Sequence, residues 1–167
     1  MSQLPLFFQF RNLIAGDGFI AFVATRGRVL LSEEDGKIWM YGVQPGGLAA
    51  FGSDRQSAFE SFRVEYHRVL EDAAQGAASF TAFRGLVQEL FQQIHEPAQA
   101  DWETARQRVL SYGPSNQGLP VIRAENFPSA IEVLSVQSDD FDPRKLQPSA
   151  AAASGSLPLD VHYGKAA

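Results

Sequence analysis

Short runs of β-forming residues, separated by turn residues, fill the first third of the chain. Phe, Val, Ile, Trp and Tyr are concentrated in these runs, which is typical of strands. Extended segments are predicted over residues 4–14, 19–24, 28–32, 37–43 and 48–51. Turns are predicted at Gly16-Asp-Gly18, Arg26-Gly27, Asp35-Gly36 and Gln44-Pro-Gly-Gly47. Asp-Gly between two apolar runs is a particularly strong hairpin signal.

Residues 37–43 differ from a half-exposed strand because their apolar side chains alternate onto both faces. In an extended chain Ile38 and Met40 lie on one face, and Trp39 and Tyr41 lie on the other. Apolar residues on both faces are typical of a strand that is buried on both sides. This strand is therefore predicted to be central in its sheet and covered.

Helical periodicity replaces the strand pattern after residue 52. Ser53 is predicted to be the N-cap of a helix, because Gln56 three residues later completes a capping-box pattern. Apolar residues then recur at helical spacing, which predicts helices over residues 53–73, 80–94 and 101–112. The pair Glu96-Pro97 is expected to end the second helix, since proline disfavours helix at the preceding residue.

The last third of the chain carries weaker signals. Residues 130–136 are predicted to form a late strand, and the prolines and small residues after 138 are typical of a tail. We therefore expect one α+β domain over residues 1–137 and a flexible C-terminal tail over 138–167. The predicted fold is a small antiparallel β-sheet of three to five strands packed against two or three α-helices.

The composition is that of a globular domain and excludes several kinds of chemistry. Of the 167 residues 45% are hydrophobic and 20% are charged, which is enough to build a core. The absence of cysteine excludes disulfides, thiolate nucleophiles and cysteine-ligated zinc. The net charge of −5 gives no overall attraction to nucleic acid. Without a signal-peptide pattern or a membrane-length apolar run, a soluble cytoplasmic protein is expected.

The candidate residues for catalysis are scattered. His67, His95 and His162 share no metal-ligand spacing, and a structural or solvated role is expected for each. The acidic runs at 33–35 and 139–142 are interpreted as solvated turns. No phosphate-binding loop and no Gly-x-Ser-x-Gly motif is present. We accordingly predict no catalytic residue, no cofactor and no metal, although an enzyme built from distant residues stays open.

Arginines supply the candidate partner-binding residues. Arg26 and Arg28 alternate along a predicted strand and so share one face, while Arg55 and Arg63 lie on the first predicted helix. These four arginines are the predicted contact residues for a partner. A protein partner is expected, no membrane is expected, and binding of nucleic acid stays open.

Residues 28–74 combine the Asp35-Gly36 hairpin, the turn at Pro45-Gly46, Gly52, and a helix carrying Ala58 and Phe59. With these features the segment resembles the HicB family of antitoxins. The resemblance implies a small fold that runs strand, strand, strand, helix. It also implies a function, which is to cover the active site of a small ribonuclease toxin, and homodimerisation through strand pairing. Two features depart from the family: an N-terminal extension, and the absence of a basic recognition helix for DNA.

Two functions from different classes follow. The first is a non-catalytic binding protein, with a HicB-like antitoxin as its most specific form. The alternative is a self-associating structural or accessory protein. In that case the apolar stripe of the second helix would be an interface rather than core, and its members are Phe80, Phe83, Phe91 and Ile94.

Overall fold

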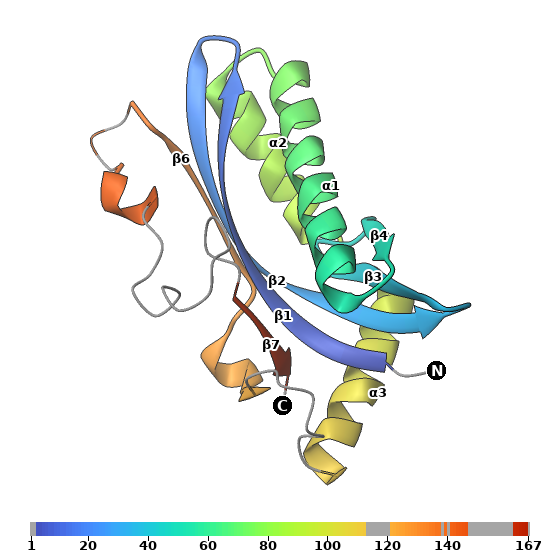
Figure 1. Ribbon diagram of the computed structural model, residues 1–167. Coiled ribbons are helices and arrows are strands. Elements are labelled where there is room, and N and C mark those ends of the chain that lie inside the picture. The colour runs from blue at the N-terminus through green and yellow to red at the C-terminus, as the bar shows by residue number, and fades with distance from the viewer. Residues whose placement is uncertain (1–2, 113–120, 138, 140, 147–161, 167) are drawn as a thin grey trace.

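The computed structural model describes residues 3–112, 121–137, 139, 141–146 and 162–166 (Figure 1). Its strands are β1 (Gln3–Gly16), β2 (Phe19–Glu34), β3 (Lys37–Gln44), β4 (Ala49–Gly52), β5 (Val121–Ile122), β6 (Ala130–Ser135) and β7 (His162–Ala166). Its α-helices are α1 (Arg55–Gly76), α2 (Phe80–Gln92) and α3 (Glu96–Tyr112), and two short 3-10 helices span Ala124–Asn126 and Pro143–Leu146. The strands form one sheet in the order β4-β3-β2-β1-β7-β5, with β6 also paired to β2.

A long antiparallel hairpin of β1 and β2 is the frame of the sheet. The two strands pair along their whole facing length, from Gln3 opposite Ser32 to Gly16 opposite Phe19. The turn predicted at Gly16-Asp-Gly18 is present, and Gly18 adopts the positive φ that suits glycine there. The turn predicted at Arg26-Gly27 is wrong, because β2 runs through it without interruption.

Gly27 has a packing role instead of a turn role. A Cβ atom at this position would lie 2.4 Å from the Gln44 carbonyl oxygen and 2.5 Å from the Phe8 ring. Glycine therefore allows two neighbouring groups to approach the β2 backbone closely. The glycine that predicted a break in the strand is instead required by the close contact of Gln44 and Phe8 with the β2 backbone.

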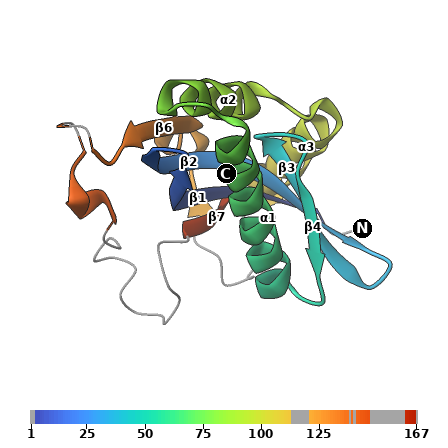
Figure 2. The same ribbon diagram turned by 90° about the horizontal axis from the view of Figure 1, so that it is seen from above.

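Two different strands share the outer side of β2. The segment Ala21–Arg26 pairs with β6, and Arg28–Glu34 pairs with β3 after a local register shift. Seen from above in Figure 2, β6 therefore lies toward one end of the sheet and β3 and β4 toward the other. The Asp35-Gly36 turn between β2 and β3 is confirmed, with positive φ at both residues.

Helix α1 covers one face of the hairpin. Its buried side chains Phe62 and Tyr66 pack on Phe8 and Phe10 of β1, with the Phe8 and Phe62 ring centroids 5.6 Å apart. The helix begins one residue later than predicted, since Asp54 and not Ser53 is the N-cap. The Asp54 carboxylate accepts a hydrogen bond from the Ser57 backbone N–H at 2.8 Å. This hydrogen bond lowers the pKa of the Asp54 carboxyl below its usual range. The Ser57 hydroxyl in turn accepts a hydrogen bond from the Asp54 backbone N–H, which completes a capping box.

Helices α2 and α3 lie on opposite faces of the sheet. Phe83 and Val87 of α2 join the large core under α1. Ala98, Trp102 and Ala105 of α3 instead cover a smaller apolar cluster on the other face. The prediction that Glu96-Pro97 ends the second helix is wrong, because α2 already ends at Gln92 and Glu96-Pro97 opens α3. Proline fits there because the first turn of a helix needs no N–H from it. His95 Nδ1 accepts from the Ala98 N–H at 3.2 Å and so caps this helix.

The α+β class is confirmed, with three helices packed against a sheet that is antiparallel except for the short parallel pair of β5 and β7. Short segments from the last third of the chain extend the sheet to seven strands, and the late strand predicted at 130–136 is present as β6. Much of the expected tail lies outside the described residues, but His162–Ala166 form β7, which pairs antiparallel with β1. These five residues are therefore part of the sheet and not of a free tail. No helix in the described ranges is long and apolar enough to cross a membrane.

We expect Phe62→Asp to unfold the domain. Phe62 is fully buried between the phenylalanines of β1 and α1. Losing such a ring costs about 3–5 kcal/mol, a buried carboxylate adds to this, and a domain has only about 5–15 kcal/mol in total. Circular dichroism on heating measures the effect. The matched control is Val64→Asp on the same helix, whose side chain is 60% exposed and which should stay folded. A folded Phe62→Asp variant would contradict this account of the core.

One polar pair lies inside the large core. The hydroxyls of Thr25 on β2 and Tyr66 on α1 are 2.6 Å apart, and both residues are buried. Tyr66→Phe or Thr25→Val leaves one buried hydroxyl without its partner, which costs about 1–3 kcal/mol. We expect the double variant to lose less stability than the sum of the two single variants, as measured by urea unfolding. Additive losses would show that the pair contributes nothing as a pair.

Burial also raises the pKa of the Tyr66 hydroxyl above its ordinary value. The folded protein therefore keeps this proton at pH values where the unfolded chain releases it. The stabilisation is complete below about pH 10, the ordinary tyrosine pKa, and is lost as the pH rises above it. We expect the free energy of unfolding to fall more steeply above pH 10 in the wild type than in Tyr66→Phe, by up to about 1.4 kcal/mol per pH unit. Equal slopes in urea titrations would contradict this.

Candidate functional site

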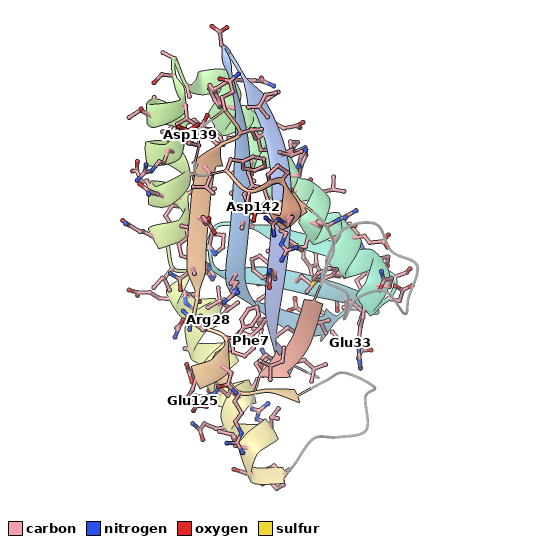
Figure 3. All side chains as sticks on the ribbon, turned by 90° about the vertical axis from the view of Figure 1, so that its left-hand side faces the viewer. Phe7, Arg28, Glu33, Glu125, Asp139 and Asp142 are labelled. Atoms are coloured by element: carbon pink, nitrogen blue, oxygen red, sulfur yellow. The ribbon has the colours of Figure 1, made fainter. Side chains whose placement is uncertain are left out.

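Arg26 and Arg28 lie on the same face of β2, as the alternation of the strand predicts. This is the face away from α1, and Figure 3 shows Arg28 there beside Phe7, its partner across the hairpin. Each guanidinium lies over an aromatic ring: Arg26 Cζ is 5.7 Å from the Phe127 ring centroid, and Arg28 Cζ is 5.3 Å from that of Trp102. Such contacts hold the cations in place on the sheet.

Arg28 is held more firmly than its neighbour. Its Nη2 donates to Gln44 Oε1 at 3.1 Å, and its Nε is buried without a hydrogen-bond partner among the described residues. Burial lowers the pKa of this guanidinium, and the carboxylate of Glu103 on α3 acts in the opposite direction. An arginine side chain remains charged under such conditions. Arg28 therefore contributes a fixed positive charge beneath α3.

The other two predicted arginines lie elsewhere. Arg55 is the first residue of α1, directly after β4 and the N-cap. Arg63 is farther along α1 and lines a groove beside the outer edge of β1. The four predicted contact residues therefore do not form one patch, and their role in partner binding stays a prediction.

The groove that contains Arg63 is the larger of two hollows beside β1, with a volume of about 560 Å³. One wall is the strand from Phe10 to Leu13. The other wall is α1, which contributes Arg63, Val64, His67, Arg68 and Glu71. Leu13 is 48% exposed and Val64 is 60% exposed, so apolar surface faces solvent on both walls. The groove thus combines apolar contact area with charges of both signs.

His67 joins the two walls of this groove. Its Nδ1 lies 3.0 Å from Asn12 Oδ1 on β1, and its Nε2 lies 3.3 Å from Glu71 Oε1 one helical turn farther along α1. The imidazole therefore fixes the distance between the strand and the helix. The expectation of a structural role for His67 agrees with this geometry.

A second hollow of about 390 Å³ lies on the sheet face away from α1. The small side chain of Ala24 lies at its floor, between Arg11 on β1 and Glu132 on β6 in the same row across the sheet. Arg26 and Gln9 line the next row. Arg11 lines both hollows, so they meet at β1.

The outer edge of β1 lies between the two hollows. Strand β7 pairs with Leu6–Gln9, and beyond Gln9 no strand in the described part of the chain pairs with this side of β1. In an antiparallel pair, alternate residues of β1 point their backbone N–H and C=O groups away from β2. Leu13 and Ala15 are at such positions, and both residues are exposed. Such an edge is a template for another strand. We take this edge with its flanking hollows as the candidate functional site.

Sequence reasoning missed most of this site. It singled out Arg26 and Arg63 but not Arg11, Asn12 or Leu13, which lie on the strand between them. The available signal was the alternation of polar and apolar residues in the first strand. The register that brings Arg11 between two hollows depends on pairing with β2 and packing of α1, which a pattern within one strand does not specify.

The remaining polar candidates have structural partners or solvent around them. Tyr41 donates to Glu34 at 3.1 Å, and the Asp142 carboxylate accepts from the Arg144 backbone at 2.9 Å. His162 belongs to β7, and its side chain lies outside the described part. In the described ranges, no group of three or more His, Asp or Glu side chains has metal-binding geometry. No family model, curated protein or solved structure matches this chain.

Proposed function

We propose that this chain is a non-catalytic protein-binding module that pairs the outer edge of β1 with an extended segment of a partner protein. The observation that carries the proposal is the exposed edge of β1 beyond Gln9, beside a groove of about 560 Å³. In strand addition, backbone hydrogen bonds supply affinity and pockets for alternate side chains supply specificity. The two hollows on either side of β1 are suited to receive alternate side chains of an added strand.

Charge at the site selects the kind of partner segment. One set of alternate side chains would meet the α1 wall, with Arg63, Arg68 and Glu71, and the other would meet Arg11, Arg26 and Glu132. Exposed apolar surface at Leu13 and Val64 adds contact area. A strand with mixed apolar and acidic side chains complements these walls best.

A HicB-like antitoxin is the most specific form of this proposal. The order of elements from Arg28 onward supports it: the second half of β2, β3, β4 and then α1 follow one another as strand, strand, strand and helix. Under this proposal the partner is a small ribonuclease toxin in the cytoplasm, whose active site the module covers. Self-association is the second candidate, because the same edge of β1 can pair with that of a second copy. The apolar stripe of α2 supports it less, since Phe83 and Phe91 are buried.

Leu13→Pro tests strand pairing directly. Proline removes the outward N–H at this edge position while the bonds from β1 to β2 are retained at neighbouring residues. Leu13→Ala is the matched control, because it removes the side chain and keeps the N–H. We expect capture of the partner by the tagged full chain from its native lysate to be lost in Leu13→Pro and largely retained in Leu13→Ala. Thermal melting checks that both variants are folded.

The identity of the captured material separates the candidate functions. A small protein at one-to-one ratio, with ribonuclease activity that the wild-type chain suppresses and Leu13→Pro does not, supports the antitoxin form. Recovery of the chain alone, with concentration-dependent assembly in the ultracentrifuge, replaces it by self-association. Equal capture by both variants shows that the edge of β1 is not the binding site.

A further inference from the structure

Three aromatic side chains form an exposed strip at the end of the sheet farthest from the β1–β2 turn. Trp39 and Tyr41 of β3 are stacked, with ring planes 7° apart and centroids 5.8 Å apart. Phe51 of β4 lies directly across from Trp39 at 4.9 Å. We call Trp39, Tyr41 and Phe51 the aromatic strip. Because β4 is the last strand in the sheet order, the strip reaches the sheet edge.

The aromatic strip is not part of the large core. The other face of the same strands packs under α1 through Met40 and Ala50, both of which are buried. On the strip side, Val43 of β3 is buried in the smaller apolar cluster together with residues of α3, and Tyr41 packs against that cluster. Phe51 is 47% exposed, and Trp39 and Tyr41 are half-buried. The prediction that this strand is covered therefore holds for the face under α1 and, on the strip face, for Val43, while the strip itself stays partly exposed. A contiguous exposed aromatic surface of this kind marks an interaction site.

A cation already lies on this surface. The Lys37 ammonium is 4.6 Å from the centroid of the Phe51 ring, which is the geometry of a cation–π contact. The contact shows that the electron-rich face of the ring is accessible from solvent and accepts a positive charge.

Carboxylates stand at the same end of the sheet. Glu34 accepts from the Tyr41 hydroxyl at 3.1 Å, and Asp35 follows in the exposed turn between β2 and β3. Glu33 pairs with Ile38 and so lies on the opposite face of the sheet. Burial and the Glu34 carboxylate both raise the pKa of the Tyr41 hydroxyl, which keeps it a hydrogen-bond donor. Two carboxylates, those of Glu34 and Asp35, beside one lysine in a chain with a net charge of −5 attract cations and repel phosphates.

We propose that the aromatic strip binds an arginine- or lysine-rich segment of a protein partner, with the carboxylates of the β2–β3 turn facing its charges. Arginine fits best, because a planar guanidinium stacks on aromatic rings and pairs with carboxylates. The proposal does not depend on strand addition at β1, since the aromatic strip lies at the other end of the hairpin and shares no residue with that site.

Fluorescence titration tests the proposal with defined probes and the full chain. A short peptide of alternating arginine and serine is expected to change the emission of Trp39, since the second tryptophan, Trp102, is buried. A glutamate–serine peptide and a single-stranded oligothymidylate are the comparison probes. Phe51→Leu keeps the apolar side chain but removes the ring, and is expected to weaken binding of the arginine peptide about fivefold to tenfold. Leu86→Ala on α2, also exposed, is the matched control and should bind as the wild type does.

The variant Lys37→Ala provides a second, independent test, in which all three aromatic rings are retained. It removes the competing cation from Phe51, so binding of the arginine peptide should become tighter. Tighter binding in Lys37→Ala together with weaker binding in Phe51→Leu supports the proposal. Absence of binding by the arginine peptide, preference for the oligothymidylate, or weaker binding in Lys37→Ala overturns it. These results are independent of the Leu13→Pro experiment, so either proposal can fail alone.

Discussion

The contact between the phenylalanines of β1 and helix α1 is the interaction on which the rest of the structure depends. A two-stranded hairpin as long as β1–β2 is marginally stable by itself in water. Phe8 and Phe10 give it one strongly apolar face, and Phe62 and Tyr66 cover that face from α1. The buried hydroxyl pair of Thr25 and Tyr66 adds a specific link between the hairpin and the helix. Once this layer is formed, the other strands and helices have a surface on which to assemble.

The length of the hairpin explains why part of a strand edge and part of the sheet face remain uncovered by the described elements. The outer side of β2 is long enough to carry two partners, β6 and β3, whereas on the outer side of β1 the described pairing stops at Gln9. On the face away from α1, helix α3 covers only the small cluster around Phe7, Leu30 and Val43. Among the described residues, nothing therefore pairs with one stretch of strand edge or packs over two parts of a sheet face. Each of them combines apolar area with charge, which is typical of a protein interface.

Charge is distributed unevenly over these surfaces. Arg26 and Arg28 are anchored on aromatic rings near the middle of the sheet, and Arg11 lies on the neighbouring strand. The acidic residues of the β2–β3 turn lie at the end of the sheet, beside the aromatic strip. The net charge of −5 alone does not indicate that basic and acidic residues lie on different parts of the sheet. A partner that contacted both ends of the molecule would need acidic and basic segments in a matching order, which favours one orientation of binding.

The sequence by itself determined the class of the protein and most of its elements. Strand alternation, the Asp35-Gly36 turn and the helical spacing around Phe62 and Phe83 are local patterns, and the structure contains each of them. Tertiary structure decided what those patterns could not express. Gly27 was predicted to form a turn, but it allows the close approach of Phe8 and Gln44 to β2. The second apolar face of β3 was predicted to be core along its length, but the cluster beneath α3 buries it only at Val43 and in part at Tyr41. The candidate site at β1 has the same origin, because strand register, helix position and unpaired edges arise from contacts between segments that are distant in the chain.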